Sequence, residues 1–209
     1  MTSLYINKPN TFNLESIVPT KISNDGKIRL KYISNDEQTP ILIETNYMDL
    51  VDINNQELLL RVPESHDFFQ KLDLHISNVL KSTIQYLQGN SLEKMRYRMI
   101  TENLDSQDIL RIIISNSKSF KTIIFDTNKT PIKLSKIDKN DQLKAKVIFE
   151  IPCIQQNANI FGLELKVHQI KLKSLNDIET SNNNQSYGSS TSSLEDELSL
   201  NSEEIVFSD

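Results

Sequence analysis

The last 36 residues (174–209) limit what this chain can fold into, because they hold eight acidic residues and no Lys or Arg. Ser and Asn dominate residues 181–193 within this segment. Such a polar, low-complexity composition cannot bury enough apolar surface to form a packed core. We therefore expect an ordered domain over residues 1–173 and a disordered acidic tail over residues 174–209. A body of this length is sufficient for one domain with its own hydrophobic core.

The two parts of the chain carry opposite charge. The body holds all 23 basic residues and 20 of the 28 acidic ones, so the formal charge of −5 divides into about +3 for the body and −8 for the tail. A basic domain with an acidic tail predicts that the tail can compete with an anionic ligand for a basic surface. Nucleic acid is the obvious anionic partner for such a surface.

Alternating polar and apolar residues predict that the body is mainly β. Residues 27–32 alternate strictly, which places Lys27, Arg29 and Lys31 on one face and Ile28, Leu30 and Tyr32 on the other. Turn signals at 24–26, 126–129 and 138–141, and the link 157–159, separate the apolar runs. We expect strands over residues 11–22, 27–33, 40–45, 57–62, 109–115, 119–126, 131–134, 143–153 and 160–173.

Two segments are predicted to be helical. In residues 65–88, Phe69, Leu72 and Ile76 recur at spacings of three and four, and Ser65 can cap the first turn. A second, short helix is expected over residues 91–99, with Lys94, Arg96 and Arg98 on a solvated face. One long helix inserted into about six to eight antiparallel strands is typical of a small Greek-key barrel or a sandwich.

The sequence contains no recognisable motif for catalysis or for metal binding. It has no Gly-rich phosphate loop, no His-x-x-x-His array and no nucleophile elbow. The single cysteine, Cys153, lies in an apolar run and is expected to be a buried free thiol in a reducing compartment. We therefore expect a protein that is not an enzyme, with no catalytic residues, no metal and no cofactor.

The expected location is intracellular and soluble, without membrane contact. The N-terminus lacks the basic and apolar regions of a signal peptide. No apolar run approaches the roughly 20 residues that a membrane-spanning helix needs.

Basic residues at alternate positions of three predicted strands suggest a nucleic-acid surface. Proteins that bind single strands combine a basic groove with aromatic rings on which bases stack. The candidate DNA-binding residues are Lys27, Arg29, Lys31, Tyr32, Tyr47, Lys144, Lys146, Lys166 and Lys171. Lys173 extends this set, and Phe120, Phe149 and Phe161 are further candidates for stacking. In the alternative interpretation, the lysines solubilise an outer face or protect a sheet edge, and the aromatic rings belong to the core.

The order of several segments resembles the single-stranded DNA-binding proteins of nucleocytoplasmic large DNA viruses. These are relatives of the replicative single-strand binder of short-tailed coliphages. The segments that carry the resemblance are residues 21–32, 41–48, 69–73 and 161–170, and it extends over about residues 12–173. It implies an OB-like Greek-key barrel with an inserted helix, followed by an acidic C-terminal tail. It also implies that Gly162 allows a close backbone approach and that Asp73 lies on a helix covering the barrel.

The resemblance further implies a function in coating single-stranded DNA during viral replication, repair and recombination. The tail would compete with DNA and contact replication proteins, namely polymerase and helicase-primase, and the protein could form a homodimer. The implied tail contacts are Glu195, Asp196, Glu197, Glu203, Glu204 and Phe207. The expected location is then the host cytoplasm, at a viral factory, or the nucleus.

The sequence departs from this family in several respects, and one of them keeps a second function open. The family often has an aromatic residue, commonly Trp, near the position of Leu165, whereas this chain has no Trp. The alternative is a structural or adaptor protein, such as a virion or scaffold component, that kept the barrel but lost DNA binding.

Overall fold

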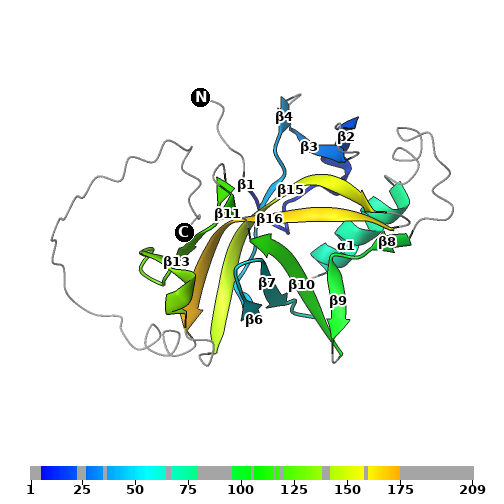
Figure 1. Cartoon of the computed structure of the whole chain (residues 1–209). Coiled ribbons are helices and arrows are strands. Elements are labelled where there is room, and N and C mark those ends of the chain that lie inside the picture. Colours follow the sequence, from blue (N-terminus) through cyan, green and yellow to red (C-terminus); the bar gives the residue numbers. More distant parts are fainter. Residues whose placement is uncertain are drawn as a thin grey trace.

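The protein is mainly β, with one short α-helix among the residues that the structure describes (Figure 1). The computed structural model describes residues 6–22, 27–34, 37–64, 67–79, 96–104, 106–114, 116–117, 120–137, 142–157 and 160–174. Of the predicted acidic tail, only Ser174, the last residue of β16, lies within these ranges.

The elements follow in chain order. The strands are β1 (Ile6–Asn7), β2 (Ile17–Ile22), β3 (Ile28–Ser34), β4 (Glu37–Thr39), β5 (Leu42–Glu44), β6 (Met48–Ile53), β7 (Glu57–Arg61), β8 (Arg96–Arg98), β9 (Thr101–Leu104), β10 (Gln107–Ile114), β11 (Asn116–Ser117), β12 (Phe120–Lys121), β13 (Ile123–Phe125), β14 (Pro131–Ile132), β15 (Leu143–Asn157) and β16 (Ile160–Ser174). The helical elements are α1 (Phe68–Leu74), the π-helical turn His75–Val79, and 3-10 turns at Leu14–Ser16 and Leu134–Lys136.

Five strands close into a barrel in the order β15–β6–β7–β10–β16, and β16 returns to β15. The β10–β16 pair is parallel and the other four are antiparallel. A closed five-stranded Greek-key barrel of this kind is OB-like, so the predicted fold class is confirmed. Closure leaves no free edge within the ring. Most of the remaining strands are joined to β15 or β16, whereas β9 pairs with β10, and β11 and β12 form a separate two-stranded sheet.

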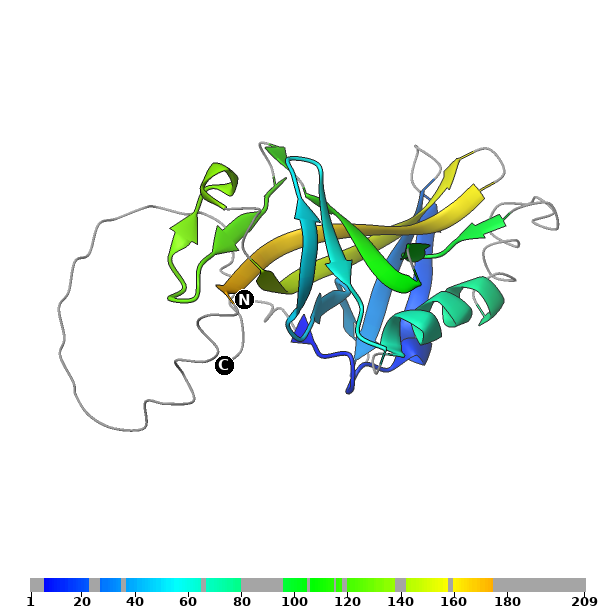
Figure 2. The same ribbon diagram turned by 90° about the horizontal axis from the view of Figure 1, so that it is seen from below.

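The longest strands, β15 and β16, form an antiparallel ribbon that crosses the whole molecule (Figures 1 and 2). On its inner face the cross-strand pairs Val147/Ile170, Phe149/Val167 and Ile154/Leu163 are all buried. Register shifts fall between Ile148 and Phe149 and between Glu150 and Cys153. Because a bulge changes the phase of alternation, these shifts keep the apolar side chains on the inner face along a ribbon that bends.

Shorter strands flank the ribbon on both edges. On the β15 side, β3 pairs with residues 153 and 154 and also carries β2 and β4. On the β16 side, β8 pairs with residues 160–162 at one end and β13 with residues 169–171 at the other, both in parallel. Figure 1 shows β8 and α1 at the same end of the molecule, with β13 at the opposite end. The ribbon is therefore the scaffold that brings distant segments of sequence together.

The helix α1 packs on the barrel through a chain of aromatic contacts. Phe69 is 1% exposed and stacks on Phe149, with ring centroids 6.4 Å apart. Phe68 meets Phe12 edge to face at 5.8 Å, and Phe12 packs against Tyr32 at 4.9 Å. These rings join α1, the N-terminal segment, β3 and β15 into one hydrophobic core.

The predicted helices differ most from the structure. The 65–88 segment is α-helical over Phe68–Leu74 and π-helical over His75–Val79, whereas residues 65–66, with the proposed cap Ser65, and 80–88 lie outside the described residues. The prediction of a helix over 91–99 is wrong at its C-terminal end, where residues 96–98 form β8. Pairing with β16 and packing of Tyr97 against Phe161 outweigh the local preference of this segment for a helix, and residues 91–95 lie outside the described residues.

The strand predictions agree more closely with the structure. The strand over 27–33 and the two long C-terminal strands are confirmed, as is the turn at 126–129, where the Asp126 carboxylate accepts from the amides of Asn128 and Thr130. The strand predicted over 11–22 begins only at Ile17, and 119–126 divides into β12 and β13. The turns at 24–26 and 138–141 and most of the 157–159 link lie outside the described residues.

Several strands lie outside the predicted strand ranges, namely β1, β4, β6, β9 and β11, in addition to β8, which stands where a helix was predicted. In β6 a register shift between Leu50 and Asp52 interrupts the alternation of apolar residues that would have revealed the strand. Within the described ranges, no helix is both long enough and apolar enough to span a bilayer.

Candidate nucleic-acid interface

The outer face of the ribbon joins residues from three neighbouring strands at the barrel end. Cys153 of β15 lies opposite Arg29 of β3 on one side and opposite Glu164 of β16 on the other. Arg29 is exposed, and Ile28 and Leu30 beside it are buried. Because strand residues alternate between faces, Lys27 and Lys31 share the outer face with Arg29, as predicted from the sequence.

The short strand β8 adds two arginines to this surface. Arg96 lies opposite Ile160 and Arg98 opposite Gly162, and both arginines are exposed. A Cβ atom on Gly162 would lie 3.0 Å from the Arg98 carbonyl oxygen and 3.2 Å from its Cβ. The absence of a side chain therefore lets β8 approach β16 closely, which confirms the close approach expected at Gly162.

A buried carboxylate holds β8 in this position. Asp73 of α1 is 2% exposed and accepts hydrogen bonds from the Tyr97 hydroxyl at 2.7 Å and from the Ile100 amide at 3.1 Å. Burial raises the pKa of Asp73, although the hydrogen bonds from Tyr97 and Ile100 act in the opposite direction. Burial, followed by the charge of Asp73, raises the pKa of Tyr97. Asp73 thus connects the helix that covers the barrel to the strand that carries the arginines.

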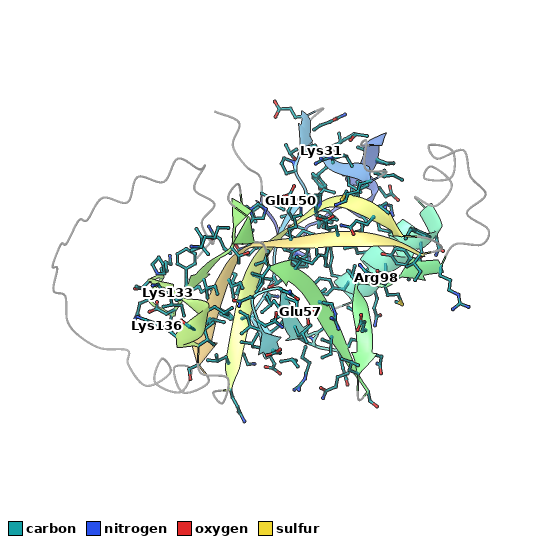
Figure 3. All side chains as sticks on the ribbon, viewed as in Figure 1. Lys31, Glu57, Arg98, Lys133, Lys136 and Glu150 are labelled. Carbon is teal, nitrogen blue, oxygen red and sulfur yellow. The ribbon has the colours of Figure 1, made fainter. Side chains whose placement is uncertain are left out.

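We call the six cations of this region the basic face: Lys27, Arg29, Lys31, Arg96, Arg98 and Lys166. Figure 3 shows Lys31 beside β3 and Arg98 beside β8, on either side of the ribbon. β3 and β8 flank the two ribbon strands, in the order β3–β15–β16–β8, so residues 27–31 and 96–98 are brought to one sheet although they are far apart in sequence.

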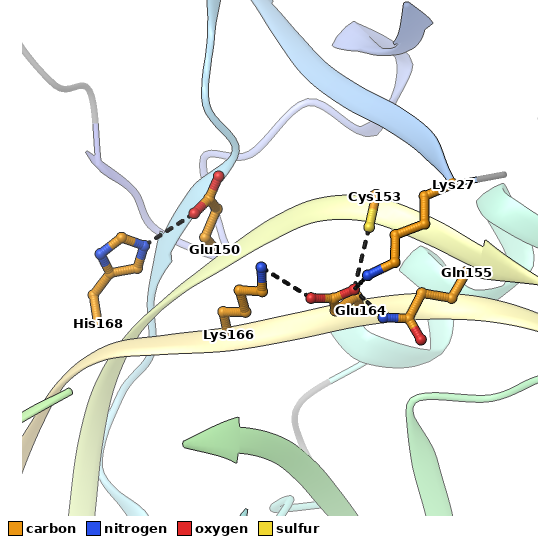
Figure 4. Close-up of polar contacts among 7 residues, drawn as sticks. All are labelled: Lys27, Glu150, Cys153, Gln155, Glu164, Lys166 and His168. Atoms are coloured by element: carbon orange, nitrogen blue, oxygen red, sulfur yellow. Dashed lines mark hydrogen bonds and ion pairs between the residues drawn. The ribbon is translucent and has the colours of Figure 1, made fainter. Parts of the chain in front are cut away.

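The acidic residue Glu164 lies within the basic face and contacts two of its lysines (Figure 4). Its side chain is 5% exposed, and its Oε2 atom accepts from Lys27 at 3.0 Å, from the Cys153 thiol at 3.4 Å and from the Gln155 amide. Its Oε1 atom accepts from Lys166 at 3.0 Å. Burial would raise the pKa of Glu164, but the bonds from Lys166, Gln155 and Lys27 outweigh it and lower the pKa to about 2. Burial, together with the Glu164 charge, raises the pKa of Cys153 to about 12, so the thiol stays protonated near neutral pH.

The predicted lysines at the other end of the ribbon form a separate cluster, which we call the arm lysines: Lys144, Lys146, Lys171 and Lys173. Lys144 lies opposite Lys173, and Lys146 opposite Lys171. Acidic side chains offset this charge, because Lys144 pairs with Asp49 at 3.4 Å and Lys146 pairs with Glu44. The buried cross-strand pair Ile148/Gln169 separates the arm lysines from the basic face.

The aromatic residues proposed for base stacking are mostly in the core. Tyr32 is 7% exposed, Phe161 2% and Phe149 0%, so these rings are not available to stack on bases. Tyr47 is half-buried, and burial, followed by the charge of Glu44, raises its pKa. The side chain of Phe120 lies outside the described residues. Every aromatic side chain that the structure describes is buried or half-buried.

Arg96 and Arg98 are the site residues that the sequence analysis missed, because it placed them on a solvated helix. Their i, i+2 spacing around Tyr97 is a signal for a strand with one buried face. Within the described ranges, no group of three His, Cys, Asp or Glu side chains could hold a metal ion.

Comparisons with known proteins give only distant similarity. No family model and no curated protein matches the chain. Among solved structures, the single-stranded DNA-binding protein from bacteriophage Enc34 in complex with ssDNA aligns with a TM-score of 0.42 at 8% identity, covering 77% of this chain and 96% of that one. The C-terminally truncated form of that protein gives 0.40 at 9% identity, with the same coverage. A third Enc34 structure gives 0.41 at 8% identity, covering 74% and 88%. These values are too low to assign a function to this chain.

Proposed function

We propose that this protein binds single-stranded DNA through the basic face. The observation that supports this proposal is the convergence of six cations from β3, β8 and β16 on one outer surface of the barrel. Cations on such a surface bind phosphates irrespective of base sequence. OB-like barrels commonly bind oligonucleotides on an outer strand face.

The burial of the aromatic side chains determines which contacts would bind single-stranded DNA. Since Tyr32 and Phe161 lie in the core, phosphate contacts contribute most of the affinity and base stacking contributes little. Each phosphate contact to a single strand contributes about −0.7 to the slope of log affinity against log salt. Extrapolated from 1 M to 0.1 M salt, one contact is therefore worth about fivefold in affinity.

Replacing arginines of the basic face tests this proposal. Arg29→Met and Arg98→Met should each weaken binding of a labelled oligo-dT about fivefold at 0.1 M salt and reduce the slope by about 0.7. Arg111→Met is the matched control, because Arg111 lies elsewhere on the barrel and pairs with Glu57 at 2.7 Å and Glu102 at 3.3 Å. If all three variants weakened binding equally, the loss would reflect only the change in net charge of the protein, and the assignment of the site would be contradicted. Stronger competition by oligo-U than by oligo-dT would point to RNA instead.

The acidic tail is proposed to compete with DNA for the basic face and to recruit replication proteins. The supporting feature is its charge of −8 beside a body of about +3. Neutralising its acidic clusters in the full chain should tighten oligo-dT binding most strongly at low salt, where charge screening is weakest. The variant replaces Glu195, Asp196, Glu197, Glu203 and Glu204 by their amides. Unchanged affinity would refute the competition.

The remaining assignments follow from the resemblance stated above. We propose that the protein acts in replication, repair and recombination of viral DNA, with Phe207 and the tail contacting a polymerase or helicase-primase. The arm lysines are proposed as a secondary DNA contact, carried mainly by Lys171 and Lys173, because Lys144 and Lys146 pair with Asp49 and Glu44. An adaptor protein without DNA binding remains the second candidate, favoured by the burial of Phe149 and Phe161. Such a protein would give no salt-dependent binding of oligonucleotides.

A further inference from the structure

Glu164 lies where a surface that binds phosphates is least expected to carry a negative charge. Its carboxylate is nearly buried beneath the basic face and contacts four donors, two of which are lysines: Lys27, just before β3, and Lys166 on β16. The two ammonium groups bond to different oxygens of the same carboxylate, each at 3.0 Å. Lys27, Lys166 and Glu164 together therefore present one net positive charge instead of two.

We propose that Glu164 withholds Lys27 and Lys166 from DNA phosphates, and so keeps the affinity for single strands below what six cations would give. This inference rests on the function proposed above. It divides the basic face into two classes of cation. Arg29, Lys31, Arg96 and Arg98 contact phosphate, whereas the two lysines at Glu164 serve the carboxylate.

The contrast in burial between the partners explains why DNA does not readily displace the carboxylate. The Lys27 and Lys166 side chains are 35% and 38% exposed, so their ammonium groups could reach a phosphate. Glu164 is 5% exposed and has no comparable route to water. Moving both lysines to a phosphate would leave a buried carboxylate without its counter-ions, which is strongly unfavourable. DNA must therefore bind with Glu164 still neutralised from the protein side.

The direct test is Glu164→Gln, which keeps the shape of the side chain and removes its charge. Each released lysine should add one phosphate contact, worth about fivefold at 0.1 M salt, so oligo-dT binding should tighten between about fivefold and 25-fold. The salt slope should steepen by about 0.7 to 1.4.

Glu150→Gln is the matched control for Glu164→Gln. Glu150 lies on β15, opposite Lys166 of β16, and so shares the outer face of the ribbon with Glu164. Its side chain contacts His168 at 3.2 Å. The Glu150→Gln substitution removes the same charge as Glu164→Gln but releases no lysine from a carboxylate. Its binding of oligo-dT should therefore tighten less than about twofold. Equal or weaker binding by Glu164→Gln than by Glu150→Gln would overturn the proposal.

Single lysine variants decide the matter even if Glu164→Gln does not fold. With Glu164 in place, Lys27→Met and Lys166→Met should each change oligo-dT affinity by less than about twofold, whereas Arg29→Met costs about fivefold. Equal losses for the lysine and arginine variants would overturn the proposal. If neither the lysine variants nor the arginine variant lost affinity for oligo-dT, the result would instead contradict the proposed function. The two failures can therefore be told apart.

Discussion

Asp73 offers a direct test of how the arginine-bearing strand is held. In Asp73→Ala, the Tyr97 hydroxyl and the Ile100 amide both lose their acceptor. A buried donor left without a partner costs about 1–3 kcal/mol. The amide of Ile100, a residue that is 6% exposed, should cost near the upper end, and the half-buried Tyr97 hydroxyl near the lower. We therefore expect a loss of about 3–4 kcal/mol in the free energy of unfolding, a large part of the roughly 5–15 kcal/mol of a typical domain.

Asp73→Asn is the matched control. Its amide oxygen can accept from Ile100, and its amide nitrogen can donate to the Tyr97 hydroxyl, so the loss should stay below about 1 kcal/mol. Urea unfolding of the three proteins measures these differences. Alanine and asparagine variants of equal stability would refute the reasoning. Since Arg96 and Arg98 lie on β8, the alanine variant alone should also weaken oligo-dT binding.

Three further predictions concern the core, the buried carboxylate and the strand contact. Phe69→Ala should cost about 3–5 kcal/mol in urea unfolding, because Phe69 is 1% exposed and stacks on Phe149; a cost below 1 kcal/mol would mean that α1 does not pack on the barrel. The pKa of Glu164 falls from 4.5 to about 2 on folding, so its stabilisation, about 3 kcal/mol, is complete above pH 4.5 and lost as pH falls toward 2. The stability difference between the native protein and Glu164→Gln should therefore shrink from pH 7 to pH 3 in chemical denaturation, and a constant difference would contradict the assignment. Gly162→Val should destabilise the protein by about 1–3 kcal/mol, because its Cβ alone would lie 3.0 Å from the Arg98 carbonyl; unchanged unfolding would show that β8 yields freely.

The strands that alternate cleanly were predictable from the sequence. Residues 27–33 place three cations outside and three apolar side chains inside, and the structure has this strand at Ile28–Ser34. The long strands that form the ribbon were also found, because their apolar residues continue over two long runs. What alternation cannot give is the partner of each strand, which depends on contacts between residues far apart in sequence.

The composition of the site was only partly predictable for the same reason. Lys27, Arg29, Lys31 and Lys166 were identified from their strands, but Arg96 and Arg98 join them through pairing of β8 with β16, which no local pattern encodes. The candidate Tyr32 failed as a surface ring because its strand turns that face toward Phe12. The role of Glu164 likewise appears only when β3 brings Lys27 to β16.

Fluorescence anisotropy of labelled oligo-dT across a range of salt concentrations tests the central claim most directly. The full-length protein should bind with a slope of log affinity against log salt near −3, from the four cations of the basic face outside the Glu164 cluster at about −0.7 each. Absence of binding, or binding that is insensitive to salt, would contradict the account and favour a barrel that binds protein partners.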